Sequence, residues 1–298
     1  MKRVLFSLLA AVVLCSASAF AQTQTTPAAG APSVVNRSGA PVDVERIIRA
    51  FTQKETEFRK ALNEYGFRRD AVIQTIAFGG QISGEYHRVS RFVFDDSGNR
   101  FERIIKFPVP TMSEISITAE DLEDLGGVQS FALESSKLHE YDFAYVGKEK
   151  IDELDTYVFD VTPKVLSDAR RLAALKKSKV PERFFQGRIW VDDQDLQIVK
   201  ARGKGVPETD KQKFPTFETY REQIDGKYWF PTYTYADDEL NFKSGQTVHL
   251  RMRIKFTDFE RLRGRATVVE QGDETKKDDE QPAKPAPTPT PPAQKPKP

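Results

Sequence analysis

Apolar and polar positions follow two different periods along the middle of the chain. Between Asp43 and Gly66, apolar side chains recur at helical spacing on one stripe, which Glu55 interrupts. Asp43 can cap the first turn and Gly66 ends the run, so the pattern predicts an amphipathic helix that packs on a sheet. Shorter helices are predicted after Thr118, which begins a capping-box-like sequence, and around residues 166–177.

From Ala71 onward the period changes to that of β-strands, which short turns rich in Asp, Gly and Asn separate. Short connections favour antiparallel hairpins. Residues 249–256 alternate between an apolar and a basic face, whereas 90–94, 101–107 and 227–235 carry apolar side chains on both faces. A sheet of this kind must cover its second face or curl around an apolar cavity. We therefore predict an α+β fold in which helices cover one side of a strongly curved antiparallel sheet, a half-open barrel.

The two ends of the chain differ in composition from this middle. Lys2 and Arg3 precede an apolar run and small residues, which is typical of a secretory signal peptide cleaved after about Ala21. The small, polar and Pro-rich composition that follows predicts a flexible leader, and the Pro/Lys-rich end predicts a disordered tail. The predicted organisation is a signal peptide at 1–21, a leader at 22–41, one half-barrel domain at 42–270 and a tail at 271–298.

Cys15 is the sole cysteine, and it raises the alternative of a lipid-anchored product cut just before an acylated cysteine. Leu14 stands where a lipoprotein signal has a small residue, so we interpret Cys15 as part of the apolar run. Cleavage after Ala21 then leaves no thiol, which excludes disulfides and cysteine nucleophiles. We expect a free periplasmic protein.

The charges of the chain are balanced. It has 45 basic and 44 acidic side chains, and removal of residues 1–21 leaves 43 against 44. This balance argues against nucleic acid as a partner. We expect a monomer that contacts lipid and, as a further possibility, envelope proteins.

Residues that could carry catalysis form no recognisable pattern. The histidines His87, His139 and His249 lack the spacing of a metal site, and the clustered aspartates fall where hairpins turn. A hydrolase would need histidines and carboxylates from distant segments to converge. We therefore predict no catalytic residues, no metal and no cofactor.

Five segments resemble exported bacterial proteins described as outer-membrane lipoprotein-sorting proteins, similar to the LolA/LolB-like superfamily. They are YVGKE at 145–149, YVFDVTPK at 157–164, FQGRIWVD at 185–192, LQIVK at 196–200 and DGKYWFP at 225–231. The resemblance implies a half-open barrel with a helical lid, whose concave face receives the acyl chains of lipoproteins. It also implies a polar switch in the groove, which no motif identifies.

The aromatic residues near these motifs are the candidates for a ligand-binding wall: Trp190, Trp229, Phe230, Tyr233 and Tyr235. The alternative is that each packs in an ordinary core between sheet and helices. At the level of function, the first hypothesis is a non-enzymatic periplasmic protein that shields acyl chains or another apolar ligand. The second is an envelope interaction or structural protein with the same fold, a packed interior and no ligand.

Overall fold

The computed structural model describes residues 34–36, 41–126, 132–178, 182–210 and 212–262. The predicted signal peptide and the Pro/Lys-rich tail lie outside these ranges, as does most of the predicted leader. Within that leader, however, Val34–Asn36 form strand β1, which pairs in parallel with β5 (Tyr141–Ile151). The folded part includes this strand, which composition missed because a three-residue run does not stand out from its polar surroundings.

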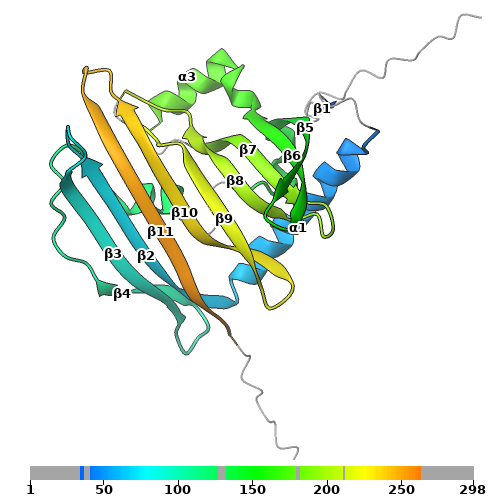
Figure 1. Cartoon of the computed structure of the whole chain (residues 1–298), viewed down its shortest axis with the longest axis horizontal. Helices are drawn as coiled ribbons and strands as arrows, with labels where there is room; N and C mark the ends of the chain where they lie inside the picture. Colours follow the sequence, from blue (N-terminus) through cyan, green and yellow to red (C-terminus); the bar gives the residue numbers. More distant parts are fainter. Residues whose placement is uncertain (1–33, 37–40, 127–131, 179–181, 211, 263–298) are drawn as a thin grey trace, which may run out of the picture. The chain divides into compact units, whose positions relative to one another are not determined.

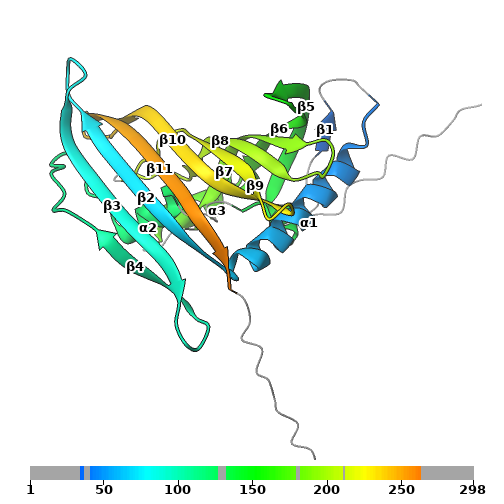
Figure 2. The same ribbon diagram turned by 60° about the horizontal axis from the view of Figure 1, so that its bottom comes forward.

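Eleven strands of the described residues form one open sheet, in the order β1-β5-β6-β7-β8-β9-β10-β11-β2-β3-β4 (Figure 1). Every neighbouring pair from β5 to β4 is antiparallel, which confirms the predicted strand arrangement. Figure 2 shows that the sheet is curved. The remaining strand bounds are β2 Tyr65–Ile76, β3 Ile82–Phe94, β4 Arg100–Lys106, β6 Leu154–Pro163, β7 Phe184–Asp192, β8 Ile198–Val206, β9 Phe217–Ile224, β10 Tyr228–Asn241 and β11 Thr247–Arg261.

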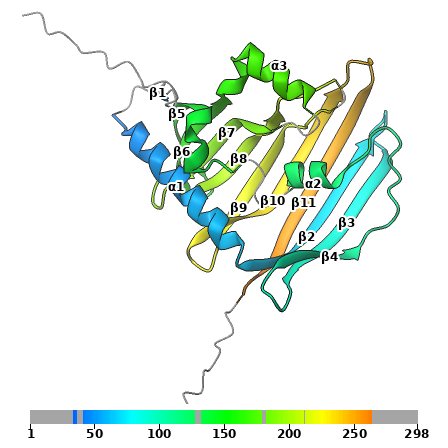
Figure 3. The same ribbon diagram turned by 180° about the vertical axis from the view of Figure 1, so that it is seen from behind.

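The three predicted helices are present. α1 spans Val44–Leu62, and the Asp43 carboxylate caps it by accepting a hydrogen bond from the backbone N–H of Arg46 at 3.0 Å. α1 ends before Tyr65, which starts β2 instead. The shorter helices are α2 (Ala119–Gly126) and α3 (Ala169–Lys177), with 3₁₀ turns at Ser135–Glu140 and Lys164–Leu166. Figure 3 shows α1 and α2 in front of the sheet and α3 at its upper edge.

The apolar stripe of α1 packs on one face of the sheet, which we call the inner face. Phe51 lies 5.8 Å, centroid to centroid, from both Phe143 of β5 and Phe159 of β6. Phe58, two helical turns further along, packs edge to face against Phe230 of β10, with 5.2 Å between the ring centroids. All five rings are buried, so side chains fill the space between α1 and this part of the sheet.

Glu55, which interrupts the apolar stripe in the sequence, is buried in the same interface. Its two carboxylate oxygens accept hydrogen bonds from the Arg221 guanidinium of β9 at 2.6 and 3.1 Å. A buried carboxylate needs such a partner, and the bidentate geometry provides it. The interruption of the stripe therefore marks where α1 is held to β9.

The opposite, outer face carries a smaller apolar cluster of Val158, Trp190 and Val199, with Trp229 packed against it. This cluster accounts for part of the apolar character found on both faces of the strands. At β4 the explanation differs, because its apolar side chains are exposed to solvent. The sheet ends there with an uncovered apolar edge, where the sequence predicted that both faces would be covered.

Candidate functional site

An arginine lies within the apolar inner face of β2. Side chains of Phe67, Arg69, Ala71 and Ile73 point to the inner face because they alternate along the strand, and all but Arg69 belong to the main apolar cluster. Arg69 is 2% exposed and is the largest of the fully buried side chains. A buried cation requires partners, and these come from two other elements.

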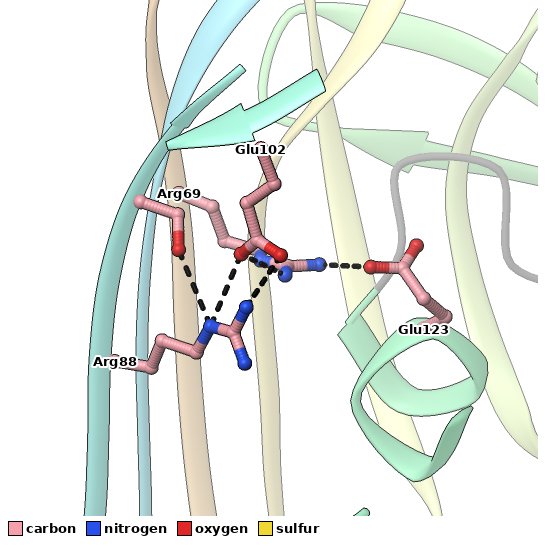
Figure 4. A network of polar contacts seen from close by, with 5 residues as sticks. Arg69, Arg88, Glu102 and Glu123 are labelled. Carbon is pink, nitrogen blue, oxygen red and sulfur yellow. Dashed lines mark hydrogen bonds and ion pairs between the residues drawn. The ribbon is translucent and has the colours of Figure 1, made fainter. Parts of the chain in front are cut away.

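The partners of Arg69 form the polar cluster of Figure 4. Its guanidinium donates to Glu102 of β4 at 2.9 Å and to Glu123 of α2 at 2.5 Å. Arg88 of β3 donates to both oxygens of Glu102, at 3.1 and 2.5 Å, and to the Ser90 hydroxyl at 3.4 Å. The cluster thus joins the edge of the sheet to α2 through one buried cation.

Two features describe the electrostatics of the cluster. The buried Nε of Arg69 has no hydrogen-bond partner among the described residues, which is unfavourable in a region of low dielectric. Burial by itself would raise the pKa of Glu102, but the Ser90 hydroxyl and the charges of Arg69 and Arg88 together lower it below its usual value. Glu102 is therefore an ionised acceptor shared by two arginines.

α2 belongs to a longer stretch, residues 111–126, that covers the inner face next to this cluster; we call it the cover segment. Its apolar side chains pack against the main cluster, Leu122 fully buried and Met112, Ile115 and Ile117 partly buried. Between β4 and α2 the segment has no regular helix or strand. It contributes apolar surface to the interior without a long element of its own.

Polar contacts fix the cover segment at a few points. Near its start, the Thr111 backbone N–H donates to the Glu85 carbonyl at 3.0 Å, and the Ser83 hydroxyl donates to Glu114 at 3.0 Å. In α2, the Asp121 carboxylate accepts from the Gln212 side chain at 2.8 Å. Thr75 and Gln246 also donate to Glu114, at 3.2 and 3.3 Å, and the Glu123 carboxylate, which accepts from Arg69, is 60% exposed.

A cavity of about 450 Å³ opens beside the cover segment. Its apolar lining comes from Ile115 and Ile117 of the segment and from Leu240 and Leu250 of the β10-β11 hairpin. Eight of its fourteen lining residues are polar or charged, Asp121 among them. The volume falls in the range of small-molecule sites, which are usually apolar with a few polar groups.

The five aromatic candidates do not converge on this cavity. Trp190 and Trp229 lie in the small cluster on the outer face, where their indole N–H groups donate to Glu149 at 2.9 Å and to Asp195 at 2.7 Å. These bonds satisfy both indoles. The structure thus brings the two tryptophans together, on the face opposite α1.

The other three candidates lie on β10 on either side of the sheet. Phe230 is fully buried in the main cluster against α1. Tyr233 and Tyr235 pair with Lys255 and Arg253 of β11, whose side chains alternate with the buried Ile254 and so face outward. Ligand binding by any of the five stays a prediction.

Sequence reasoning missed Arg69, although a signal was present. In the order Phe67, Arg69, Ala71, Ile73 a cation occupies a position that alternation assigns to the apolar face. Its partners Glu102 and Glu123 lie on different elements far along the chain, so no local spacing reveals them. An inward-facing charge on a strand is the signal that could have located this cluster.

The histidines remain apart in the structure. His87 bonds Asp70 at 3.0 Å, His249 bonds Asp237, and His139 lies near Glu140. Among the described residues, no group of three or more His, Cys, Asp or Glu side chains is arranged to hold a metal ion. None of the helices described here is both long and apolar enough to cross a membrane.

No protein-family model and no curated protein sequence matches the chain. Among solved structures, the chain is similar to a DUF1329 family protein from Desulfovibrio piger, with 16% identity, 73% of this chain and 94% of that chain covered, and a TM-score of 0.36. It is also similar to a LolA superfamily protein from Nitrosomonas europaea, with 15% identity, coverage of 74% and 94%, and a TM-score of 0.31. A putative outer membrane lipoprotein-sorting protein domain from Vibrio parahaemolyticus gives 12% identity, coverage of 74% and 94%, and a TM-score of 0.31.

The identities are below 20% and the TM-scores are below 0.5. We therefore infer the function from the residues of this chain.

Proposed function

We propose that this protein is an exported, non-enzymatic binding protein that shields acyl chains of lipoproteins, or another apolar ligand, on its inner face. The observation that carries the proposal is the cover segment. It buries apolar surface of the sheet with four apolar side chains, of which Leu122 alone is fully buried, and polar contacts hold it to the sheet. An acyl chain offers the same kind of surface and would replace it.

The energetics of this exchange favour reversible binding. Twelve methylenes that become buried contribute roughly 10 kcal/mol, at about 0.8 kcal/mol each. Displacing the segment exposes Leu122 and the partly buried Met112, Ile115 and Ile117, at a cost of about 4–8 kcal/mol in total. The balance of a few kcal/mol suits a protein that must release its ligand again.

The two halves of the inner face differ in their capacity for such an exchange. Beneath α1, interlocked aromatic rings and the Glu55–Arg221 pair hold the helix to the sheet. Beside the cover segment, a cavity of about 450 Å³ already provides space. We therefore place ligand entry at the cavity, with α2 moving outward and α1 staying in place.

A cross-link tests whether the cover segment must move. In a chain without residues 1–21 there is no other cysteine, so Asp121→Cys and Gln212→Cys can be joined by a one-carbon bis-methanethiosulfonate reagent. We expect a fluorescent fatty acid, cis-parinaric acid, to bind saturably before cross-linking, not to bind after it, and to bind again after reduction. The matched control joins Glu140→Cys to Arg171→Cys, away from the cover segment, and should leave binding intact.

Two results contradict the proposal in different ways. Unchanged binding in the cross-linked protein would show that the ligand site lies away from the cover segment. The absence of saturable binding in every form would favour the second hypothesis, an envelope interaction or structural protein without a ligand. The packed aromatic interface of α1 favours this second hypothesis, because side chains already fill that part of the interior.

A further inference from the structure

The last strand of the sheet carries an uncovered apolar row. β4 ends the strand order, and in the described part of the chain it pairs only with β3. From residue 101 to 109, five large apolar side chains are between 43% and 86% exposed: Phe101, Ile104, Ile105, Phe107 and Val109. We call residues 101–109 the β4 edge. Exposed apolar edge strands are uncommon in monomers, since they invite pairing with another chain.

The β4 edge also carries two cations without acidic partners. Among the described residues, neither Arg103 nor Lys106 forms an ion pair, and both are exposed. Glu102 lies between them along the strand, but it is occupied by Arg69 and Arg88 on the inner face. The edge therefore offers free positive charge and no free negative charge.

The two cations lie on one face, whereas Ile104 and Phe107 lie on the other. Arg103 pairs with Arg91 of β3 and Lys106 with Val89, so both lie on the outer face. Ile104 pairs with Ser90 on the inner face, and Phe107 lies there too, 5.2 Å from the ring of Tyr86. A strand added to this edge would meet both cations together with Phe101 on the outer face, and Ile104 and Phe107 on the inner face.

We propose that the β4 edge binds an extended polypeptide segment of a partner protein in which acidic and apolar residues alternate. The segment would add to the sheet as a further strand, with its main chain bonded to β4, its acidic side chains beside Arg103 and Lys106, and its apolar side chains beside Ile104 and Phe107. This binding surface is separate from the cover segment, and the proposal does not depend on the lipid-binding function.

Two other occupants fit the edge less well. A lipid surface would leave the outward N–H and C=O groups of β4 without hydrogen-bond partners in hydrocarbon, which costs several kcal/mol for each group. A second copy of the chain would bring the cationic edge against an identical cationic edge, and like charges facing each other across strands are destabilising. An acidic strand satisfies the main chain, the apolar side chains and the charges together.

The test uses three labelled ten-residue peptides and the chain without residues 1–21. The first alternates Val and Glu, the second alternates Val and Lys, and the third is the Val-Glu peptide with N-methyl groups on every second amide. In fluorescence anisotropy, we expect saturable binding of the Val-Glu peptide and at least tenfold weaker binding of the Val-Lys peptide. N-methylation should abolish binding, because it removes the donors that bond to β4.

A charge-reversed variant separates this interaction from general charge effects. The double substitution Arg103→Glu and Lys106→Glu should lose the Val-Glu peptide and gain the Val-Lys peptide. The matched control, Arg253→Glu with Lys255→Glu, reverses two exposed cations on the outer face of β11 and should leave the preference unchanged.

Several outcomes overturn the proposal. Equal affinity for the Val-Glu and Val-Lys peptides removes the charge argument, and binding of the N-methylated peptide removes the added strand. Binding to phosphatidylglycerol vesicles, lost in the Arg103→Glu and Lys106→Glu variant while no peptide binds, assigns the edge to lipid. Self-association in sedimentation velocity that the same variant abolishes assigns the edge to a second copy.

Discussion

Breaking the contact between Glu123 and Arg69 is the most direct way to loosen the cover segment without disturbing the core. Substituting Glu123→Gln removes the negative charge from α2 and keeps the side-chain size. Arg69 retains Glu102 as an ionised partner at 2.9 Å, so no buried cation is left without an anion. The substitution therefore weakens the attachment of α2 and leaves the sheet intact.

The size of the effect follows from the exposure of the two partners. A hydrogen bond to a charged group contributes about 1.5–3 kcal/mol when buried, whereas exposed ion pairs contribute roughly 0.2–1 kcal/mol. Arg69 is 2% exposed but the Glu123 carboxylate is 60% exposed, so water screens one end of the contact. We expect a loss of about 1 kcal/mol, which corresponds to roughly a fivefold change in the equilibrium between closed and open α2.

Hydrogen exchange measures this equilibrium locally. The backbone amides of α2 should lose about fivefold in protection in the Glu123→Gln protein, while those of α1 keep theirs. If α2 must open for binding, the affinity for cis-parinaric acid should rise by a similar factor, because the competent state is more populated. Glu120→Gln is the matched control: it makes the same chemical change at an exposed position of the same helix.

Two results would refute this reasoning. Equal loss of protection in α1 and α2 would mean that the contact stabilises the whole fold and not the cover segment. Greater opening of α2 with unchanged fatty-acid affinity would mean that ligand entry does not require it. In an Arg69→Met background the effect of Glu123→Gln on α2 should be smaller, since the contact with Arg69 is already gone.

Further predictions concern the ionisable groups of the core. The pKa of Glu102 lies below its usual value of about 4.3, so its ionised form stabilises the fold above that pH, and stability is lost as the pH falls through the folded-state pKa. Urea titrations should show a weaker dependence on acid pH in Glu102→Gln. Burial, ahead of all other causes, raises the pKa of Tyr65 and Tyr141 to about 12, so the folded state holds these protons longer and stability falls as the pH rises from about 10 to about 12. Absorbance at 295 nm should show late ionisation that disappears in the Tyr→Phe variants. Glu55→Ala should cost about 3–5 kcal/mol in unfolding free energy by leaving Arg221 buried without a partner, whereas Glu55→Leu combined with Arg221→Met should recover most of it. No recovery would point to a structural role of the pair that apolar packing cannot replace.

The strands, the antiparallel hairpins and the helices follow from periodicity and short turns because local spacing encodes them, whereas the pairing of β11 with β2 is long-range and was not predicted. Asp43 caps α1 as its position before the apolar stripe predicted, and Thr118 bonds Asp121 at the start of α2. In the same way, the alternation at 249–256 gives β11 one buried and one wet face. Elements of this kind need only neighbouring residues for their specification.

The placement of the site depends on pairs that no local pattern reveals. Aromatic residues on both faces of a strand suggested one wall of a cavity, yet Trp190 and Phe230 lie on opposite faces of the sheet. Each packs well where it is, since a large ring stabilises whichever face it reaches. The charged residues Glu55 and Arg69 marked the interior more specifically, because a buried charge requires a partner whereas a buried ring does not.

The distribution of charge over the inner face supports the proposal that α2, and not α1, moves to admit a ligand. The Glu55–Arg221 pair is bidentate, with side chains 3% and 11% exposed, so separating it would leave two charges in a dry interface. Glu123, by contrast, already faces water, and separating it from Arg69 leaves Arg69 with Glu102. Moving α1 away from the sheet therefore costs more electrostatic free energy than moving α2. A ligand that supplies apolar contacts but no charge would displace α2 first, so the opening of the inner face is directed to the side of the cavity.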